Sequence, residues 1–130
     1  MTEPPPATQH IVWFYAEDLD ETCRFYEEAL GFEQVFDEGK ARIFRAGANV
    51  FIGICSAWGD RKVQTDGAMF TFVTDEVDAW HERLKAHGAR IGGEPHMLDE
   101  FNIYTLFARD PNGYRLEFQQ FLDPAWPKPA

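Results

Sequence analysis

Residues 10–31, HIVWFYAEDLDETCRFYEEALG, and residues 69–88, MFTFVTDEVDAWHERLKAHG, set the architecture, because each reads as a strand followed by a helix. In both, a run of aromatic and β-branched residues precedes an acidic turn, and an amphipathic stretch then stops at Gly31 or Gly88. Val12 and Phe70 are 58 positions apart, and the two glycines are 57 apart. The chain therefore contains an internal duplication.

The segments that follow each helix predict three further strands per repeat. Turn signals such as Gly47 and Pro111-Asn112-Gly113 separate these segments, so the repeated unit is βαβββ. We expect an arm at 1–9, one domain at 10–121 and a second arm at 122–130. Within the domain, module 1 covers about 10–55, a linker about 56–67 and module 2 about 68–121.

Composition restricts the class of protein. The 130 residues are 45% hydrophobic and 15% aromatic, which is enough apolar surface for a folded domain. A formal net charge of -10 opposes attraction to nucleic acid or to anionic lipid, so neither is expected as a partner. The N-terminal residues lack the pattern of a signal peptide and no apolar run is long enough to span a bilayer, which predicts a cytoplasmic protein. Cys23 and Cys55 are predicted to be free thiols.

Two motifs carry a resemblance to a known family. Asp18-Leu19, Arg24-Phe25-Tyr26 and Ala29-Leu30-Gly31-Phe32 resemble the first signature of the vicinal oxygen chelate superfamily, and Arg109-Asp110-Pro111-Asn112-Gly113 with Glu117 resembles its closing signature. This superfamily includes glyoxalase I, extradiol dioxygenases and bleomycin-resistance proteins. The resemblance implies an α+β fold in which two βαβββ modules curl into an eight-stranded cup with the helices outside.

The resemblance also implies four positions at which enzymes of the superfamily hold a divalent metal. Here those positions read Ile11, Phe51, Met69 and Glu117, the Phe51 position following from the pairing of Gly47 with Gly113. Three of them lack the oxygen or nitrogen donors that such a metal needs, so we expect no metal and no cofactor. Strand alternation directs His10 away from the cup unless a β-bulge turns it inward.

Strand alternation predicts an aromatic lining with a few polar groups, which suits a small organic ligand. The same aromatic positions are also compatible with a plain core. A buried Glu117 needs a partner, which we expect to be Arg115 or the ligand. The predicted ligand-binding residues are Trp13, Tyr15, Phe51, Met69, His96, Arg115 and Glu117.

Two functions follow from these residues. The first is a metal-independent small-molecule-binding protein that resembles the bleomycin-resistance branch and sequesters a drug. The second is a glyoxalase-like lyase, isomerase or dioxygenase with a rearranged or absent metal site, in which Glu117 is the catalytic residue. The resemblance implies a homodimer, and it leaves open whether the cup forms within one chain or between two.

Overall fold

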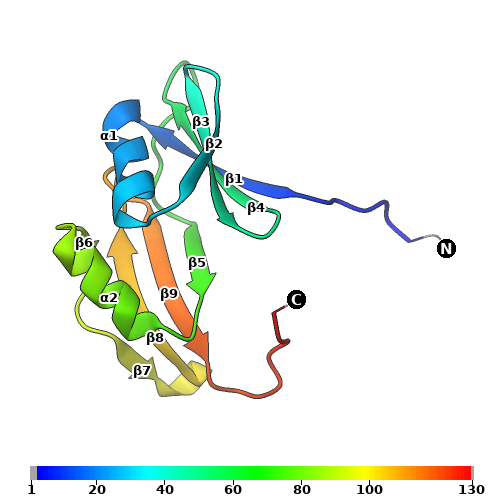
Figure 1. The fold of residues 1–130 in the computed structure, drawn as a ribbon, viewed down its shortest axis with the longest axis vertical. Coiled ribbons are helices and arrows are strands. Elements are labelled where there is room, and N and C mark those ends of the chain that lie inside the picture. Colours follow the sequence, from blue (N-terminus) through cyan, green and yellow to red (C-terminus); the bar gives the residue numbers. More distant parts are fainter. Residues whose placement is uncertain (1–2, 130) are drawn as a thin grey trace. The chain divides into compact units, whose positions relative to one another are not determined.

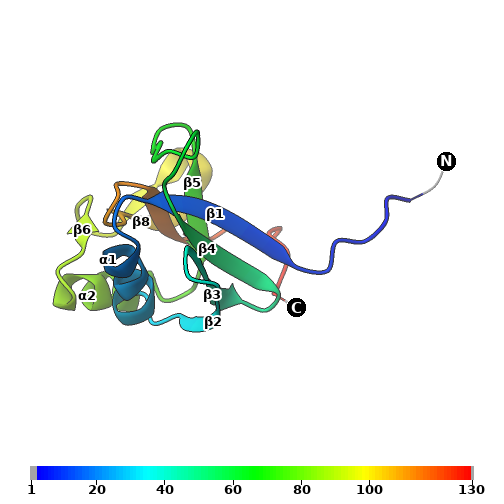
Figure 2. The same cartoon turned by 90° about the horizontal axis from the view of Figure 1, so that it is seen from above.

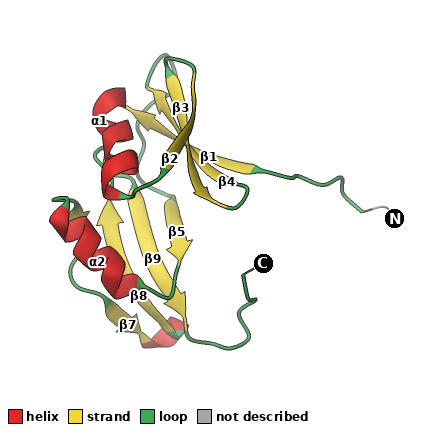
Figure 3. Cartoon of the chain, viewed as in Figure 1, coloured by secondary structure: helices red, strands yellow, loops and turns green. Residues whose placement is uncertain are grey.

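The computed structural model describes residues 3–129, so the outermost residues of both predicted arms, 1–2 and 130, lie outside the described residues. The chain divides into two compact units, Met1–Gln64 and Thr65–Ala130. The division falls inside the segment 56–67, for which the sequence predicts a linker. Each unit contains its own sheet and its own helix (Figure 3).

The first unit is a four-stranded sheet with a helix on one face. Strand β1 runs parallel to β4, and both views place these two strands side by side (Figures 1 and 2). The strand order is β1-β4-β3-β2, and the remaining neighbours are antiparallel. The elements are β1 (His10–Ala16), α1 (Leu19–Arg24), the π-helical turn η1 (Phe25–Ala29), β2 (Glu33–Asp37), β3 (Ala41–Gly47) and β4 (Val50–Ser56).

The second unit repeats this arrangement with one additional strand. Its strand order is β5-β9-β8-β6, β5 runs parallel to β9, and β7 pairs with β8. The elements are β5 (Met69–Val73), α2 (Val77–Ala86), β6 (Arg90–Ile91), β7 (His96–Leu98), the 3-10 turn η2 (Asp99–Phe101), β8 (Ile103–Arg109) and β9 (Arg115–Phe121). The predicted α+β class and the repeated βαβββ order are confirmed.

Strand β7 is the element that the sequence analysis did not predict. It has three residues and lies between Pro95 and the acidic pair Asp99-Glu100. Such a segment is too short to show the alternation that indicates a strand, and its flanking residues favour turns. Its hydrogen bonds to β8 depend on tertiary contacts instead.

The first helix contains one residue more than the second, and η1 accommodates that residue. The backbone N–H of Leu30 donates to Phe25 O, five residues earlier, where an α-helix would use the fourth. Leu19 and Val77 are 58 positions apart, whereas Gly31 and Gly88 are 57 apart. The change in spacing therefore occurs within the helix, and a wider turn absorbs it.

The ends of the two helices follow local chemistry. Asp18 caps α1 by accepting a hydrogen bond from the Glu21 N–H at 3.1 Å. Both helices end at glycines with positive φ, 73° at Gly31 and 68° at Gly88, as expected. The cap position of α2 is Glu76, which makes no capping bond through its side chain.

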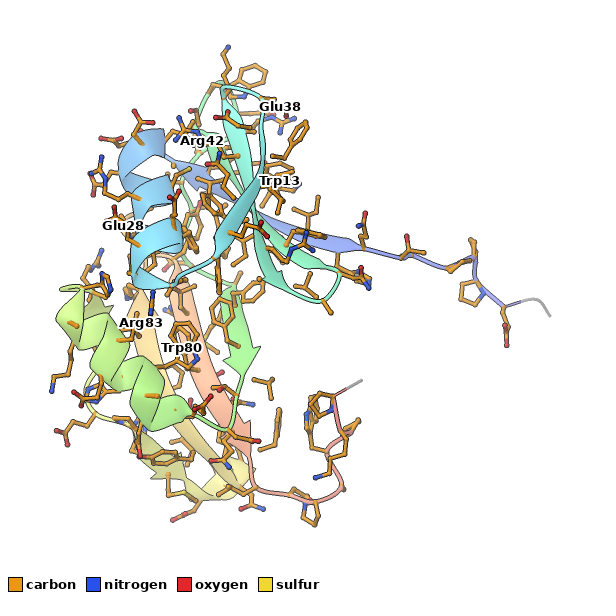
Figure 4. The ribbon with its side chains drawn as sticks, viewed as in Figure 1. Trp13, Glu28, Glu38, Arg42, Trp80 and Arg83 are labelled. Atoms are coloured by element: carbon orange, nitrogen blue, oxygen red, sulfur yellow. The ribbon has the colours of Figure 1, made fainter. Side chains whose placement is uncertain are left out.

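Each helix packs on an aromatic cluster of its own sheet. In the first unit, the ring of Tyr26 lies 6.4 Å from Phe14 and 6.3 Å from Phe44. In the second, Trp80 of α2 lies 4.8 Å from Phe118 of β9 (Figure 4). These residues lie on the helix-covered faces that strand alternation predicts, although Val12, on the same face of β1, is 38% exposed. The core of the first unit therefore begins at Phe14.

The described part of the C-terminal arm folds back on its own unit. Trp126 stacks on Phe121 with ring centroids 3.9 Å apart, and Asp123 accepts from the N–H of Ala125. The arm has no regular strand between residues 122 and 129, as its prolines predict.

Cys23 and Cys55 are both free thiols, as predicted. Cys23 lies on the buried side of α1, and this burial raises the pKa of its thiol because an apolar environment disfavours the thiolate. Among residues 3–129, no helix is long and apolar enough to cross a membrane.

Candidate functional site

Trp13 lies flat on the helix-free face of the first sheet. It pairs in register with Gly53 of β4, so the two residues point to the same side. A Cβ atom on residue 53 would overlap the indole, with Trp13 Cδ2 only 2.8 Å away. Trp13 is 42% exposed. Gly53 therefore makes room for an aromatic surface that remains accessible to solvent in the structure.

Phe51 and Ile11 extend this face toward the start of β4. They are partners in register, and Arg45 of β3 lies over the Phe51 ring, with its guanidinium carbon 5.3 Å from the ring centroid. Glu33 accepts a hydrogen bond from Arg45 at 3.4 Å. Phe51 itself is buried, whereas Ile11 is 43% exposed. Phe51 thus belongs to the packing of the sheet more than to its exposed surface.

Glu117 lies on the helix-free face of the second sheet and is only 4% exposed. Its Oε1 accepts from the Thr71 hydroxyl at 2.8 Å, and its Oε2 accepts from the Thr105 hydroxyl at 2.7 Å. The Gln119 amide, oriented with its nitrogen toward the carboxylate, donates to Oε1 at 3.1 Å and to Oε2 at 2.9 Å. Three neutral donor side chains from three strands therefore hold this carboxylate.

Arg115 does not neutralise Glu117. Over residues 3–129 the structure contains no ion pair to Glu117, and Arg115 is exposed at the edge of the same face. The expected partner of the carboxylate was a cation or a ligand, and the structure supplies hydroxyl and amide groups instead. Sequence reasoning missed Thr105 because it lies on a different strand, twelve residues from Glu117, and only the register of β8 with β9 brings the two together.

A cavity of about 280 Å³ opens on the helix-free face of the second sheet. Phe107 is the partner of Glu117 in register, and Met69 is the partner of Arg115, so a strand neighbour of Glu117 lines the cavity although Glu117 itself does not. Met69 is 47% exposed. The cavity therefore combines apolar side chains with cationic ones. Its lining consists of Met69, Gly92, Phe107, Ala108, Arg109, Arg115 and Leu116.

His96, a predicted binding residue, and His10, which was expected to point away from the cup, lie in different environments. His96 lies on the helix-free face of the second sheet, with its ring 6.1 Å from the ring of Phe107 and its Nδ1 3.0 Å from Glu94 O. His10 lies at the start of β1, in an unbroken register with β4 that continues to Ala16. The pair of strands has no bulge there, so alternation keeps His10 on the same side as Val12.

The register of the two sheets also tests which positions of the repeat are equivalent. Trp13 corresponds to Thr71, and their partners are Gly53 and Glu117. By register, the equivalent of Glu117 is therefore Gly53, two residues beyond Phe51. The sequence analysis aligned Gly47 with Gly113 and so made Phe51 the equivalent of Glu117, which the register shows to be wrong. The two glycines are not equivalent, because the β3–β4 connection has two residues, 48–49, whereas the β8–β9 connection has five, 110–114.

Comparison with known proteins identifies the family. Residues 8–118 match the model of the Glyoxalase/Bleomycin resistance protein/Dioxygenase superfamily. The chain therefore belongs to this superfamily. A search of curated proteins found no match.

Three solved structures illustrate the likeness. A lactoylglutathione lyase from Agrobacterium tumefaciens is 26% identical, with a TM-score of 0.71 and coverage of 91% of this chain and 96% of that one. A glyoxalase/bleomycin resistance protein/dioxygenase from Nocardioides is 19% identical, with a TM-score of 0.79 and coverage of 99% and 92%. TioX from Micromonospora sp. ML1 is 17% identical, with a TM-score of 0.74 and coverage of 89% and 100%.

The donor set does not fit the divalent metal that the resemblance implies. Ile11, Phe51 and Met69 carry no ligand for a hard cation, and Gly53, the equivalent of Glu117 by register, has no side chain. Both oxygens of Glu117 already accept hydrogen bonds from neighbouring side chains. Throughout the described range, 3–129, no three His, Cys, Asp or Glu side chains are grouped in a way that could hold a metal ion.

Proposed function

We propose that this protein is a metal-independent small-molecule-binding protein that holds a planar organic ligand without altering it. The observation that carries the proposal is the Trp13 indole, which lies on Gly53 with 42% of its surface exposed. A large exposed aromatic group fixed on a rigid sheet is suited to stacking against a flat ligand.

Metal independence is supported by the positions that the family uses for a metal. In the first sheet, an indole covers the position equivalent to Glu117, and in the second sheet the Glu117 carboxylate is held by Thr71 and Thr105. A ligand would then be recognised by contact and hydrogen bonding. Drug sequestration, and with it antibiotic resistance, is the role we propose within this class. The support for this role is that the superfamily's name includes bleomycin resistance.

The predicted binding residues remain part of the proposal, but they differ in how much surface they offer to a ligand. Trp13, Met69, His96 and Arg115 are exposed on the helix-free faces, and Tyr15 is partly exposed. Phe51 and Glu117 are buried, so they support the binding surface more than they contribute area to it.

A cytoplasmic location and a homodimer belong to the same proposal. Two free thiols are typical of a reducing compartment. Exposed apolar side chains such as Ile11, Met69 and Trp126 suit an interface with a second copy.

Replacement of Gly53 tests the aromatic surface directly. A Gly53→Ala variant must displace the indole, so we expect it to bind 2-naphthamide roughly fivefold more weakly than the natural sequence, since aromatic stacking contributes about 1 kcal/mol. Isothermal titration calorimetry measures the affinity. Gly47→Ala is the matched control, because a Cβ atom at residue 47 meets nothing within 4 Å.

Two results would overturn the proposal. One is binding that disappears when divalent cations are removed with a chelator. The other is equal affinity in the Gly53→Ala and Gly47→Ala variants, which would show that the Trp13 surface takes no part.

A second candidate function is catalysis by Glu117 in a lyase, isomerase or dioxygenase with a rearranged or absent metal site. The observation that favours it is a buried carboxylate without a cationic partner among the described residues, next to a cavity. Such a carboxylate can accept a proton from a bound molecule. Turnover of any substrate that survives Glu117→Gln would contradict this role.

A further inference from the structure

Three arginines form a row across adjacent strands of the second sheet. Arg90 of β6 pairs in register with Arg109 of β8, and Arg109 pairs with Arg115 of β9. Directly paired residues of neighbouring strands point to the same face. Arg115 and Glu117 are two residues apart on β9, so the row lies on the helix-free face that carries Glu117.

The side chains of Arg90 and Arg109 approach one turn, at Gly113. Arg109 Nη1 donates to the Gly113 carbonyl at 2.8 Å. The two terminal nitrogens of Arg90 lie 4.0 Å from the place where a Cβ atom of Gly113 would be. Arg109 and Arg115 both line the cavity of about 280 Å³, together with Met69 and Phe107.

No carboxylate of the described chain, residues 3–129, forms an ion pair with any of these three arginines. The two nearest acidic residues along the chain face other donors. Asp110 is fully buried and accepts from the N–H groups of Asn112 and Tyr114, each at 2.9 Å, and Glu117 accepts from its threonines and Gln119.

An unpaired row of like charges is unfavourable, since adjacent cations repel one another. It is also unexpected in a protein whose formal net charge is -10. Guanidinium groups bind carboxylates and phosphates through paired N–H donors, and a bound anion would remove the repulsion.

We infer that Arg90, Arg109 and Arg115 form an anion-binding site at the cavity of the second sheet, whose ligand carries a carboxylate or phosphate group on an apolar body. Met69 and Phe107 contact the apolar part, and the arginines contact the charged end. This inference goes beyond the proposed function, because the cavity belongs to the second unit and the Trp13 surface belongs to the first.

Two probes that differ only in charge test the inference. 2-Naphthoate and 2-naphthamide share a ring system, and only the first is an anion. We expect 2-naphthoate to bind about tenfold more tightly than 2-naphthamide, and Arg115→Gln to abolish that preference. Arg24→Gln is the matched control, because it removes the same charge from an exposed position in the first unit.

A titration with inorganic phosphate, at constant ionic strength, tests the site without the apolar part. The arginine Nε–H signals in ¹H–¹⁵N spectra should shift saturably for Arg90, Arg109 and Arg115 and not for Arg24. Comparison of phosphate with 2-naphthoate also shows which of the two anionic groups the row prefers.

The outcomes separate this inference from the proposed function. If the two naphthalene probes bind equally and phosphate shifts none of the three arginines, the anion site is overturned and small-molecule binding stands. If phosphate shifts the arginines and 2-naphthamide does not bind, the anion site stands and the proposed function fails. Equal loss of both probes in Arg115→Gln would also overturn the anion site, because Arg115 would then act only through packing.

Discussion

The Glu117 carboxylate shows how a single buried charge can be held without a cation. Each hydrogen bond to a charged group contributes about 1.5–3 kcal/mol, whereas a buried carboxylate that loses a donor retains the cost of its desolvation. Thr105, which is fully buried, and Thr71, which is partly exposed, supply two of the donors. The threonine hydroxyls are therefore part of what allows Glu117 to remain in the sheet.

Thr105→Val should lower the free energy of unfolding by about 1–3 kcal/mol, because it removes a buried donor while keeping the shape of the side chain. Thr71→Val is the matched comparison and should cost less, since water can reach that position. Chemical denaturation measures both.

A double-mutant cycle assigns the loss to the carboxylate. In a Glu117→Gln background, Thr105→Val should cost at least about 1 kcal/mol less, because the charge that needs the hydroxyl is gone. If the two substitutions were additive, the hydrogen bond between Thr105 and Glu117 would not be the source of the stability.

Residues of the site differ in how far the sequence reveals them. The alternation of β9 places Glu117 and Gln119 on the same face from sequence alone, because the side-chain period of a strand is two. Gly53 carries no side chain, and so shows no preference that a pattern could detect. Thr105 and the arginine row depend on pairing between strands, which local sequence does not specify.

At the scale of elements, the π-helical turn η1 marks the place where the two repeats differ in length. Glu27 and Glu28 lie in it and are exposed, whereas Tyr26, Ala29 and Leu30 on either side are buried. The wider turn lets the residues after it keep their buried positions, although one residue has been added.

Deletion of Glu27 should therefore convert η1 into ordinary α-helix and change the free energy of unfolding by no more than about 1 kcal/mol, an effect typical of a surface change. Chemical denaturation followed by far-UV circular dichroism measures the change.

Deletion of Glu82 in α2 is the matched control. That helix has no wide turn, so the deletion rotates the fully buried Leu84 away from its sheet. It should cost more than about 3 kcal/mol, as for other losses of a buried leucine. Similar costs for the two deletions would show that η1 does not accommodate an added residue.

Most elements could be predicted because their sequences show a clear hydrophobic period or a residue typical of a helix end. The exceptions are elements whose sequences lack such features. The strands and the glycine ends of both helices follow from periodicity and from backbone preference. The start of α2 shows no such local signal, because the Thr74 hydroxyl, two residues before the cap position, accepts the hydrogen bond from the Glu76 N–H. Strand β7 exists only because β8 is available to pair with it.

At the scale of the whole molecule, both units repeat one topology but use their helix-free faces differently. The first presents an indole on a glycine, and the second presents a carboxylate held by hydroxyl groups beside a cationic cavity. The duplication was evident from sequence, because both halves retain the pattern of a strand followed by a helix.

We expect a homodimer in solution, since exposed apolar side chains such as Ile11 and Met69 are costly to leave in water. Sedimentation velocity should give the mass of two chains. Met69→Lys should shift the equilibrium toward the monomer, whereas Lys62→Glu, a charge change at an exposed linker position, should not. A monomer at all concentrations of the natural sequence would contradict the expectation.

The contact between Trp13 and Gly53 restricts the order in which this surface could change over evolution. An acidic residue cannot enter position 53 while the indole occupies that space, because any β-carbon there already overlaps the ring. A smaller residue at position 13 would have to come first. Two substitutions, in a fixed order, therefore separate the present surface from one that carries a carboxylate in each unit. The first of them removes the Trp13 indole before any acidic group is gained.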